Sequence, residues 1–188
     1  GAYPTFKYHV DGFGGNMSLI PYNNYYEDLD SLLIAAKKSK AKILYLSNPD
    51  NPMGTFHPKD DIQHFIDNIP DDTILCLDEA YADFVDKDEL APINVEQENV
   101  IRFRTFSKAY GLAGLRVGYG IGNNKLVKAF NKVRNHFGVN KLGQIAAKVA
   151  LEDQEHLRNV LKQVDQSKNF VIDLFFGSIP PFLFQYIL

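Results

Sequence analysis

Three short polar clusters in the sequence contain residue types that catalyse reactions on small molecules. Each follows an apolar run: Asn51 the first, Asp78 and Tyr81 the second, Lys108 the third. The intervals of 27 residues from Asn51 to Asp78 and 30 from Asp78 to Lys108 each match one strand–helix–strand unit. Ligands of open α/β sheets bind beyond the carboxyl ends of the strands, so we expect the clusters to meet at one sheet edge. They would supply a carboxylate, a phenol, an amide and an amine, groups suited to acid–base and nucleophilic catalysis.

Alternating apolar runs and amphipathic stretches predict the elements that position these clusters. Strands are expected over residues 17–22, 42–47, 73–77, 100–103 and 115–121. Helices are expected over residues 26–38, from Pro58 onward, and over 124–135, 141–152 and about 154–175. Continuous apolar strands separated by amphipathic helices indicate an α/β fold, a three-layer sandwich whose mainly parallel sheet is covered on both faces.

Other chemistries lack the residues they need. Asp78-Glu79 after an apolar strand is similar to the strand-ending acid of an ATPase, but the chain has no G-x-x-x-x-G-K-[ST] phosphate loop, so a nucleotide hydrolase rests on these two residues alone. The G-x-G at Gly118 lies inside a predicted strand, which disfavours a dinucleotide site. The five histidines show no metal-ligand spacing, and no G-x-S-x-G elbow is present, so neither a metal site nor a hydrolase serine is expected.

Composition restricts the class of protein. With 45% hydrophobic residues the chain can bury a core, and its single cysteine, Cys76, lies in an apolar run and reads as a buried small hydrophobe. No apolar stretch approaches the length of a membrane span and no signal peptide opens the chain, so we expect a soluble, cytoplasmic protein.

The charges of the chain are unevenly distributed: residues 1–98 carry a net charge of −11 and residues 99–188 carry a net charge of +8. Without a helix-turn-helix this split does not predict a nucleic-acid partner.

The two ends of the sequence lead us to expect a piece of a longer protein. Gly1 is not a methionine, and residues 180–188 form an apolar run without charge. A free terminus is more often polar, because an exposed apolar tail promotes association.

Three blocks carry a resemblance to a known family. They are SNPDNPMG (47–54), DEAYADF (78–84) and TFSKAYGLAGLRVGY (105–119). Together they resemble the fold-type I pyridoxal-phosphate aminotransferases, and the nearest branch is the histidinol-phosphate aminotransferase family. The resemblance extends over residues 3–151, with the blocks in the family's order and spacing. Met53, where the family usually has threonine, and the segment 136–140 depart from its pattern.

The resemblance implies catalytic roles for three residues. Lys108 matches the lysine that forms the Schiff base with the cofactor aldehyde and, once displaced by the substrate, moves the proton between Cα and C4′. Asp78 matches the acid that pairs with the pyridine nitrogen and keeps it protonated. Tyr81, together with Asn51, matches the residues that bind the ring's 3-oxygen.

Further cofactor contacts follow from the same resemblance. Arg116 matches the arginine that binds the cofactor phosphate, Thr105 and Ser107 would donate hydroxyls to that phosphate, and Phe6 lies where a ring stacks on the cofactor. Structural interpretations remain open: a surface lysine for Lys108, a cap or strand end for Asp78, packing for Tyr81 and Phe6, and turns for Thr105 and Ser107. The remaining arginines are interpreted as surface or salt-bridge residues, namely Arg102, Arg104, Arg134 and Arg158.

For the whole protein, the resemblance implies a dimeric aminotransferase of amino-acid biosynthesis that moves an amino group from an amino acid or amino-alcohol phosphate to a 2-oxo acid. Histidinol phosphate with 2-oxoglutarate is the implied pair, and an aromatic amino acid is an alternative donor. Residues 1–140 would form a cofactor-binding large domain without its N-terminal part, and 141–188 helices leading to a truncated small C-terminal domain. The phosphate-binding glycine-serine turn would lie before Gly1 and the carboxylate-binding arginine after Leu188. A phosphothreonine-type decarboxylase and a non-catalytic regulatory domain remain alternatives.

Overall fold

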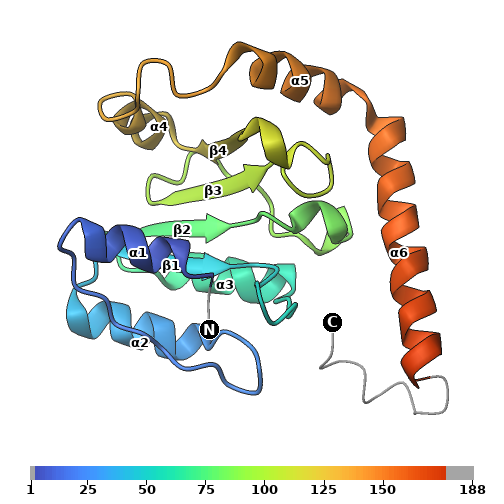
Figure 1. Cartoon of the computed structure of the whole chain (residues 1–188). Helices are drawn as coiled ribbons and strands as arrows, with labels where there is room; N and C mark the ends of the chain where they lie inside the picture. The colour runs from blue at the N-terminus through green and yellow to red at the C-terminus, as the bar shows by residue number, and fades with distance from the viewer. Residues whose placement is uncertain (1–2, 177–188) are drawn as a thin grey trace. The chain divides into compact units, whose positions relative to one another are not determined.

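The computed structural model describes residues 3–176 (Figure 1). These residues form two compact units. The sheet unit comprises the chain up to Arg104 together with Gly120–Val133. The lysine unit comprises Thr105–Tyr119 and the chain from Arg134 onward. The apolar run at residues 180–188 lies outside the described residues.

The sheet unit is built around parallel strands. Its elements are α1 (Thr5–Gly12), α2 (Leu29–Ser39), β1 (Ile43–Ser47), α3 (Lys59–Asn68), β2 (Ile74–Asp78), β3 (Val100–Thr105), β4 (Gly118–Gly122) and α4 (Asn124–Phe130), with short 3₁₀ turns at Ala82–Phe84 and Lys87–Glu89. The last residue of β3 and the first two residues of β4 belong to the lysine unit. The strand order is β1-β2-β3-β4, and β2 pairs in parallel with both β1 and β3. Ser47 is level with Asp78, and Asp78 with Phe103, so the carboxyl ends of these strands lie side by side.

Strand alternation divides the side chains between the two faces of this sheet. On one face Leu46 and Leu77 are fully buried together with Phe65 of α3 and with Leu33 and Ala36 of α2. On the other face Tyr45 of β1 contacts Phe6 of α1. Helices therefore lie on both faces, and the predicted α/β class with a mainly parallel sheet is confirmed.

Several predicted elements have shifted boundaries. α2 begins at Leu29, not Tyr26, because the Asp28 carboxylate accepts the Ser31 N–H at 2.9 Å and caps the helix there. The last predicted strand is shorter, since Ala113–Leu115 is a 3₁₀ turn and the strand begins at Gly118. The helix predicted over 124–135 ends at Phe130.

The strand predicted over residues 17–22 is wrong, and helix α1 was not predicted. Residues 17–22 are irregular, Leu19 is 70% exposed, and Pro21 has no N–H to donate to a neighbouring strand. Among residues 3–176 no strand pairs with this segment. Without a paired neighbour, a strand at residues 17–22 would leave its apolar side chains exposed and its backbone hydrogen bonds unmade, so no strand forms.

The lysine unit is mainly helical. It contains the 3₁₀ turn Ala113–Leu115 and the helices α5 (Lys141–Glu152) and α6 (Gln154–Phe176), which confirm the predicted helices over 141–152 and about 154–175. Its core is formed by Phe106, Ala109, Tyr110, Val117, Ala147 and Leu157. None of the helices within residues 3–176 is both long and apolar enough to cross a membrane. The division into domains at residue 140 stays a prediction.

Candidate active site

Asp78 ends β2 and is held at both carboxylate oxygens. The Tyr45 hydroxyl donates to Oδ2 at 2.7 Å, and the Ala80 N–H donates to Oδ1 at 3.0 Å. Tyr45 reaches this position because Ser47 is level with Asp78 and residues two apart in a strand share one face. Burial and the negative charge of Asp78 raise the pKa of the Tyr45 phenol well above its usual range, so it is a neutral donor.

Asn51 and Tyr81 come from the loops after β1 and β2 and converge. The Asn51 side-chain nitrogen lies 3.5 Å from the Tyr81 hydroxyl oxygen, and both side chains are half-buried. At this length the contact is a loose one. An amide N–H and a phenol O–H so placed can both donate to one ligand oxygen.

Phe6 of α1 lies against Tyr45. The two rings stack with their centroids 4.6 Å apart and their planes 19° apart. Phe6, Tyr45 and Asp78 therefore form one connected series of contacts, and a second contact in the same unit joins the predicted residues Asn51 and Tyr81.

A second acidic group, Asp50, lies beside this series and was missed from the sequence. Its Oδ2 accepts the Tyr22 hydroxyl at 2.8 Å and the Met53 N–H at 3.3 Å, while Oδ1 has no hydrogen-bond partner among the described residues. Glu27 accepts the Ser47 N–H at 3.1 Å. Burial and the charge of Asp50 raise the pKa of Glu27 to about 8. In the sequence, Asp50 and Glu27 look like surface acids beside apolar segments. Only their burial in the folded chain distinguishes them.

Replacing Glu27 with glutamine is expected to remove a pH dependence of stability. The pKa of Glu27 in the folded chain, about 8, lies above that of an unfolded glutamate, so the folded chain retains a proton that the unfolded chain loses. The free energy of unfolding therefore falls as the pH rises through this window, and Glu27→Gln should gain about 2 kcal/mol relative to the wild type between about pH 5.5 and pH 7.5. Urea unfolding at both pH values measures this gain. Glu96→Gln at an exposed position is the control, and equal behaviour of the two variants would contradict the prediction.

Glu79 forms a buried ion network that anchors the chain directly after Asp78. Its Oε1 accepts from Arg102 Nη1 and its Oε2 from Arg104 Nε, each at 2.9 Å. Arg102 also donates to the Ala91 and Pro92 carbonyls, both at 2.8 Å. Both arginines are thus salt-bridge residues, one of the two predicted alternatives, and Arg102 is buried.

In the lysine unit, Lys108 is exposed on a segment whose neighbours are buried. Phe106 and Ala109 belong to the core on either side of it. The Gly111 N–H donates to the Lys108 carbonyl at 2.9 Å, and Gly111 has φ +67°, a conformation that favours glycine. Buried neighbours and this turn fix the backbone while the amine is presented outside the core.

Thr105, Ser107 and Arg116 make local contacts in the same unit. The Ser107 N–H donates to the Thr105 hydroxyl at 3.0 Å, which agrees with the turn interpretation of these residues and leaves the Ser107 hydroxyl out of that bond. Arg116 is exposed with φ +55°, and its Nη1 donates to the Ala113 carbonyl at 2.8 Å.

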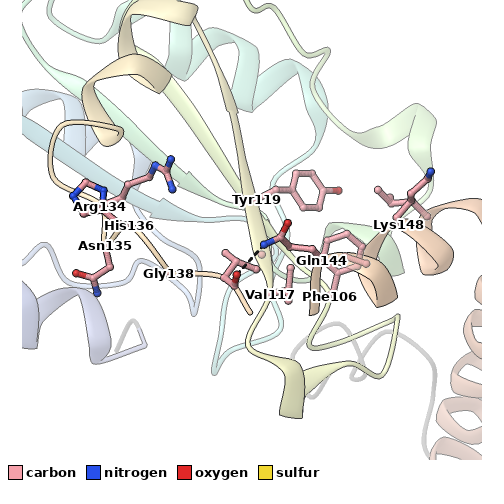
Figure 2. A pocket seen from close by; sticks show the side chains of 13 residues that line it. Phe106, Val117, Tyr119, Arg134, Asn135, His136, Gly138, Gln144 and Lys148 are labelled. Atoms are coloured by element: carbon pink, nitrogen blue, oxygen red, sulfur yellow. Dashed lines mark hydrogen bonds between the residues drawn. The ribbon is translucent and has the colours of Figure 1, made fainter. Parts of the chain in front are cut away.

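A separate pocket of about 890 Å³ lies within the lysine unit (Figure 2). Its apolar lining includes Phe106, Val117, Tyr119, Ala147 and Leu151. In Figure 2 the side chains of Arg134 and His136 lie apart from that of Lys148, so these three side chains do not form one cluster. None of the predicted site residues, all of which the structure describes, lines this pocket.

Cys76 is half-buried, so the expectation of a fully buried side chain holds only in part. Burial raises the pKa of its thiol to about 11, so the reactive thiolate is scarce at neutral pH. Within residues 3–176, no three histidine, cysteine or acidic side chains cluster in a way that could hold a metal ion.

Comparison with known proteins decides the family. The family model for aminotransferases of class I and II matches residues 2–175 of this chain. The chain belongs to the class I and II aminotransferase family. The resemblance of its three sequence blocks to such enzymes is therefore confirmed.

Relatives within this family carry one name repeatedly. Histidinol-phosphate aminotransferase 2 of Carboxydothermus hydrogenoformans is 38% identical over 174 residues, 90% of this chain and 48% of that protein. Histidinol-phosphate aminotransferase of Staphylococcus epidermidis is 41% identical over 152 residues, 79% of this chain and 42% of that protein. The chain thus spans about half the length of the curated relatives it matches.

Solved structures agree with the fold. The crystal structure of histidinol-phosphate aminotransferase from Sinorhizobium meliloti in complex with pyridoxal-5'-phosphate has a TM-score of 0.88 and 45% identity, covering 90% of this chain and 47% of that one. L-threonine-O-3-phosphate decarboxylase from Porphyromonas gingivalis has a TM-score of 0.69 at 23% identity, covering 83% of this chain and 46% of that one, a likeness of fold alone.

Proposed function

We propose that this chain is part of a pyridoxal-phosphate-dependent aminotransferase. The observation that carries the proposal is the convergence of the Asn51 and Tyr81 side chains to 3.5 Å, in loops that follow adjacent strands, with Asp78 at the end of one of them. This donor and acceptor set fits pyridoxal phosphate, because the ring offers one phenolic oxygen and one basic nitrogen. Family membership and the cofactor named for the Sinorhizobium structure support it.

Each predicted site residue of the sheet unit would contact one part of the cofactor. The Asn51 amide and Tyr81 hydroxyl would donate to the 3-oxygen, and the Asp78 carboxylate would accept the proton of the ring nitrogen. Phe6 would place an aromatic face against the ring. When bound, pyridoxal phosphate supplies an aldehyde that condenses with amines and a ring that withdraws electrons from the substrate's α-carbon.

Residues of the lysine unit enter the proposal through the resemblance. The Lys108 amine would bind the aldehyde and afterwards carry the proton to and from the substrate. Arg116, Thr105 and Ser107 would bind the phosphate, the arginine with two parallel N–H groups and the others with hydroxyls. The positive φ of Arg116 and the turn at Thr105 fix the backbone from which these groups extend.

For the substrates, we propose histidinol phosphate as amino donor and 2-oxoglutarate as acceptor. The names of relatives that are 38% and 41% identical support this choice. A homodimer in the cytoplasm, with residues 1–140 in a cofactor-binding domain and 141–188 leading to a small domain, completes the proposal. The half-buried Cys76, whose thiol pKa is raised, is compatible with a reducing compartment.

Absorption spectroscopy of the full-length protein tests this function. Addition of pyridoxal phosphate should produce a visible band, and addition of histidinol phosphate should convert the bound cofactor to its amine form and remove that band. Added 2-oxoglutarate should restore it. Aspartate and phenylalanine at the same concentration are the matched donors for comparison.

Three outcomes would change the assignment. A wild-type protein that develops no visible band contradicts cofactor binding. A band that no amino donor removes indicates the non-catalytic regulatory alternative, and release of carbon dioxide from a phosphorylated amino acid indicates the decarboxylase.

A further inference from the structure

Tyr45 is the described side chain that joins two predicted cofactor residues. Its hydroxyl donates to Asp78 Oδ2 at 2.7 Å, and its ring stacks on Phe6 at 4.6 Å. The sequence places it only as one member of an apolar strand. Its hydroxyl is therefore a part-buried donor aimed at one carboxylate, in a position where phenylalanine would keep the same ring.

We propose that Tyr45 is a positioning residue for the cofactor's ring nitrogen, acting by fixing the orientation of the Asp78 carboxylate. The inference rests on the proposed function, because it takes Asp78 as the partner of that nitrogen. It extends the site by a residue that contacts neither the reacting atoms nor the substrate.

The geometry explains how one hydroxyl sets the carboxylate. Tyr45 donates to Oδ2 and the Ala80 N–H donates to Oδ1 at 3.0 Å, so the two oxygens have separate anchors. Two anchors on different oxygens restrict rotation about the Cβ–Cγ bond more than either anchor alone. Each carboxylate oxygen has more than one lone pair, so an N–H of the ring can still be accepted.

The chemistry of a phenol suits this role. A lysine or arginine would orient the carboxylate but would also cancel the negative charge that keeps the ring nitrogen protonated. Tyr45 donates while remaining neutral, because burial and the charge of Asp78 raise the pKa of its phenol. The ring stacking with Phe6 limits its own rotation, so the donor stays in place.

Binding of two cofactors to the full-length protein tests the inference. The variant is Tyr45→Phe, which keeps the ring and its stacking, and the ligands are pyridoxal phosphate and its analogue with carbon in place of the ring nitrogen. We expect the variant to bind pyridoxal phosphate roughly tenfold more weakly than the wild type, which is the effect of losing one hydrogen bond to a charged group. We expect the variant and the wild type to bind the carbon analogue with the same affinity.

Two further variants complete the design. Tyr22→Phe removes a matched phenol–carboxylate bond to Asp50, 2.8 Å long, and should leave the affinity for both ligands unchanged. In an Asp78→Asn background Tyr45→Phe should weaken binding no further, because the two residues act as a unit. The melting temperature of each cofactor-free variant monitors its folding.

Each other result overturns the inference. Unchanged affinity of Tyr45→Phe for pyridoxal phosphate, or an equal loss for both ligands, shows that the hydroxyl does not act through the ring nitrogen. A further loss in the Asp78→Asn background does the same. Absence of a visible band in the wild type overturns the proposed function itself, and the inference with it, and is recognised before any variant is compared.

Discussion

Replacing Lys108 with alanine is expected to abolish the visible absorption band that pyridoxal phosphate produces in the full-length protein and to lower the transamination rate by about 10⁴-fold. The alanine removes both the amine that binds the aldehyde and the base that moves the substrate proton. Because Lys108 is exposed, its replacement leaves the core of the lysine unit intact, and the melting temperature should change little.

Two controls separate the amine from the charge. Lys108→Arg retains a positive charge but cannot bind the aldehyde, so it should lose the band as completely as alanine. Lys148→Ala, at an exposed position of α5 in the same unit, should retain both the band and the rate. A visible band that survives in Lys108→Ala would move the reactive lysine elsewhere in the chain.

Replacing Glu79 with glutamine is expected to destabilise the protein by roughly 3–5 kcal/mol, because it leaves the buried Arg102 guanidinium without its carboxylate partner. The side chains of Glu79 and Arg102 are each 4% exposed, and that of Arg104 is 17% exposed. Burial already lowers the pKa of Arg102, which shows how poorly water solvates this charge. Denaturant unfolding of the variant and the wild type measures the difference.

Surface and apolar replacements test the burial argument for Glu79. Lys125→Ala breaks an ion pair with Glu98 at the surface, where the Lys125 side chain is 75% exposed and the Glu98 side chain 62% exposed. This variant should leave the unfolding midpoint nearly unchanged. The double variant Glu79→Leu, Arg102→Met removes the charge at both ends and should recover part of the loss. Equal effects of Glu79→Gln and Lys125→Ala would show that the network contributes no more than a surface pair.

Much of the fold follows from local signals in the sequence. Apolar runs such as 73–77 predict strands because a parallel strand buried on both faces needs apolar side chains throughout. The helix predicted over 141–152 has these same bounds in the structure, where the Asn140 side chain caps it by accepting the Gly143 N–H at 2.7 Å. The strand prediction for residues 17–22 was wrong, because a strand forms only where a neighbouring strand can pair with it. A local sequence pattern does not show whether such a neighbour exists.

The candidate site divides in the same way. Asn51, Asp78, Tyr81 and Lys108 stand out as polar residues after apolar strands, and their proposed roles come from the resemblance. Tyr45, Asp50 and Glu27 do not stand out, because their importance depends on strand register and on burial by segments distant in the sequence. Only the folded chain shows that these groups are withdrawn from water.

Asp78 and Glu79 are adjacent in the chain yet serve opposite faces of the sheet. Asp78 turns toward Tyr45 and the proposed ligand, whereas Glu79 turns toward Arg102, which is level with Leu77 of the core. During divergence the two acids would thus be under separate selection. A descendant that no longer bound the proposed ligand could lose Asp78 but would still need Glu79 for folding. Relatives that retain Glu79 without Asp78 would then be folded proteins that no longer bind the cofactor. A single-residue insertion in β2 would exchange the two faces and eliminate both properties together.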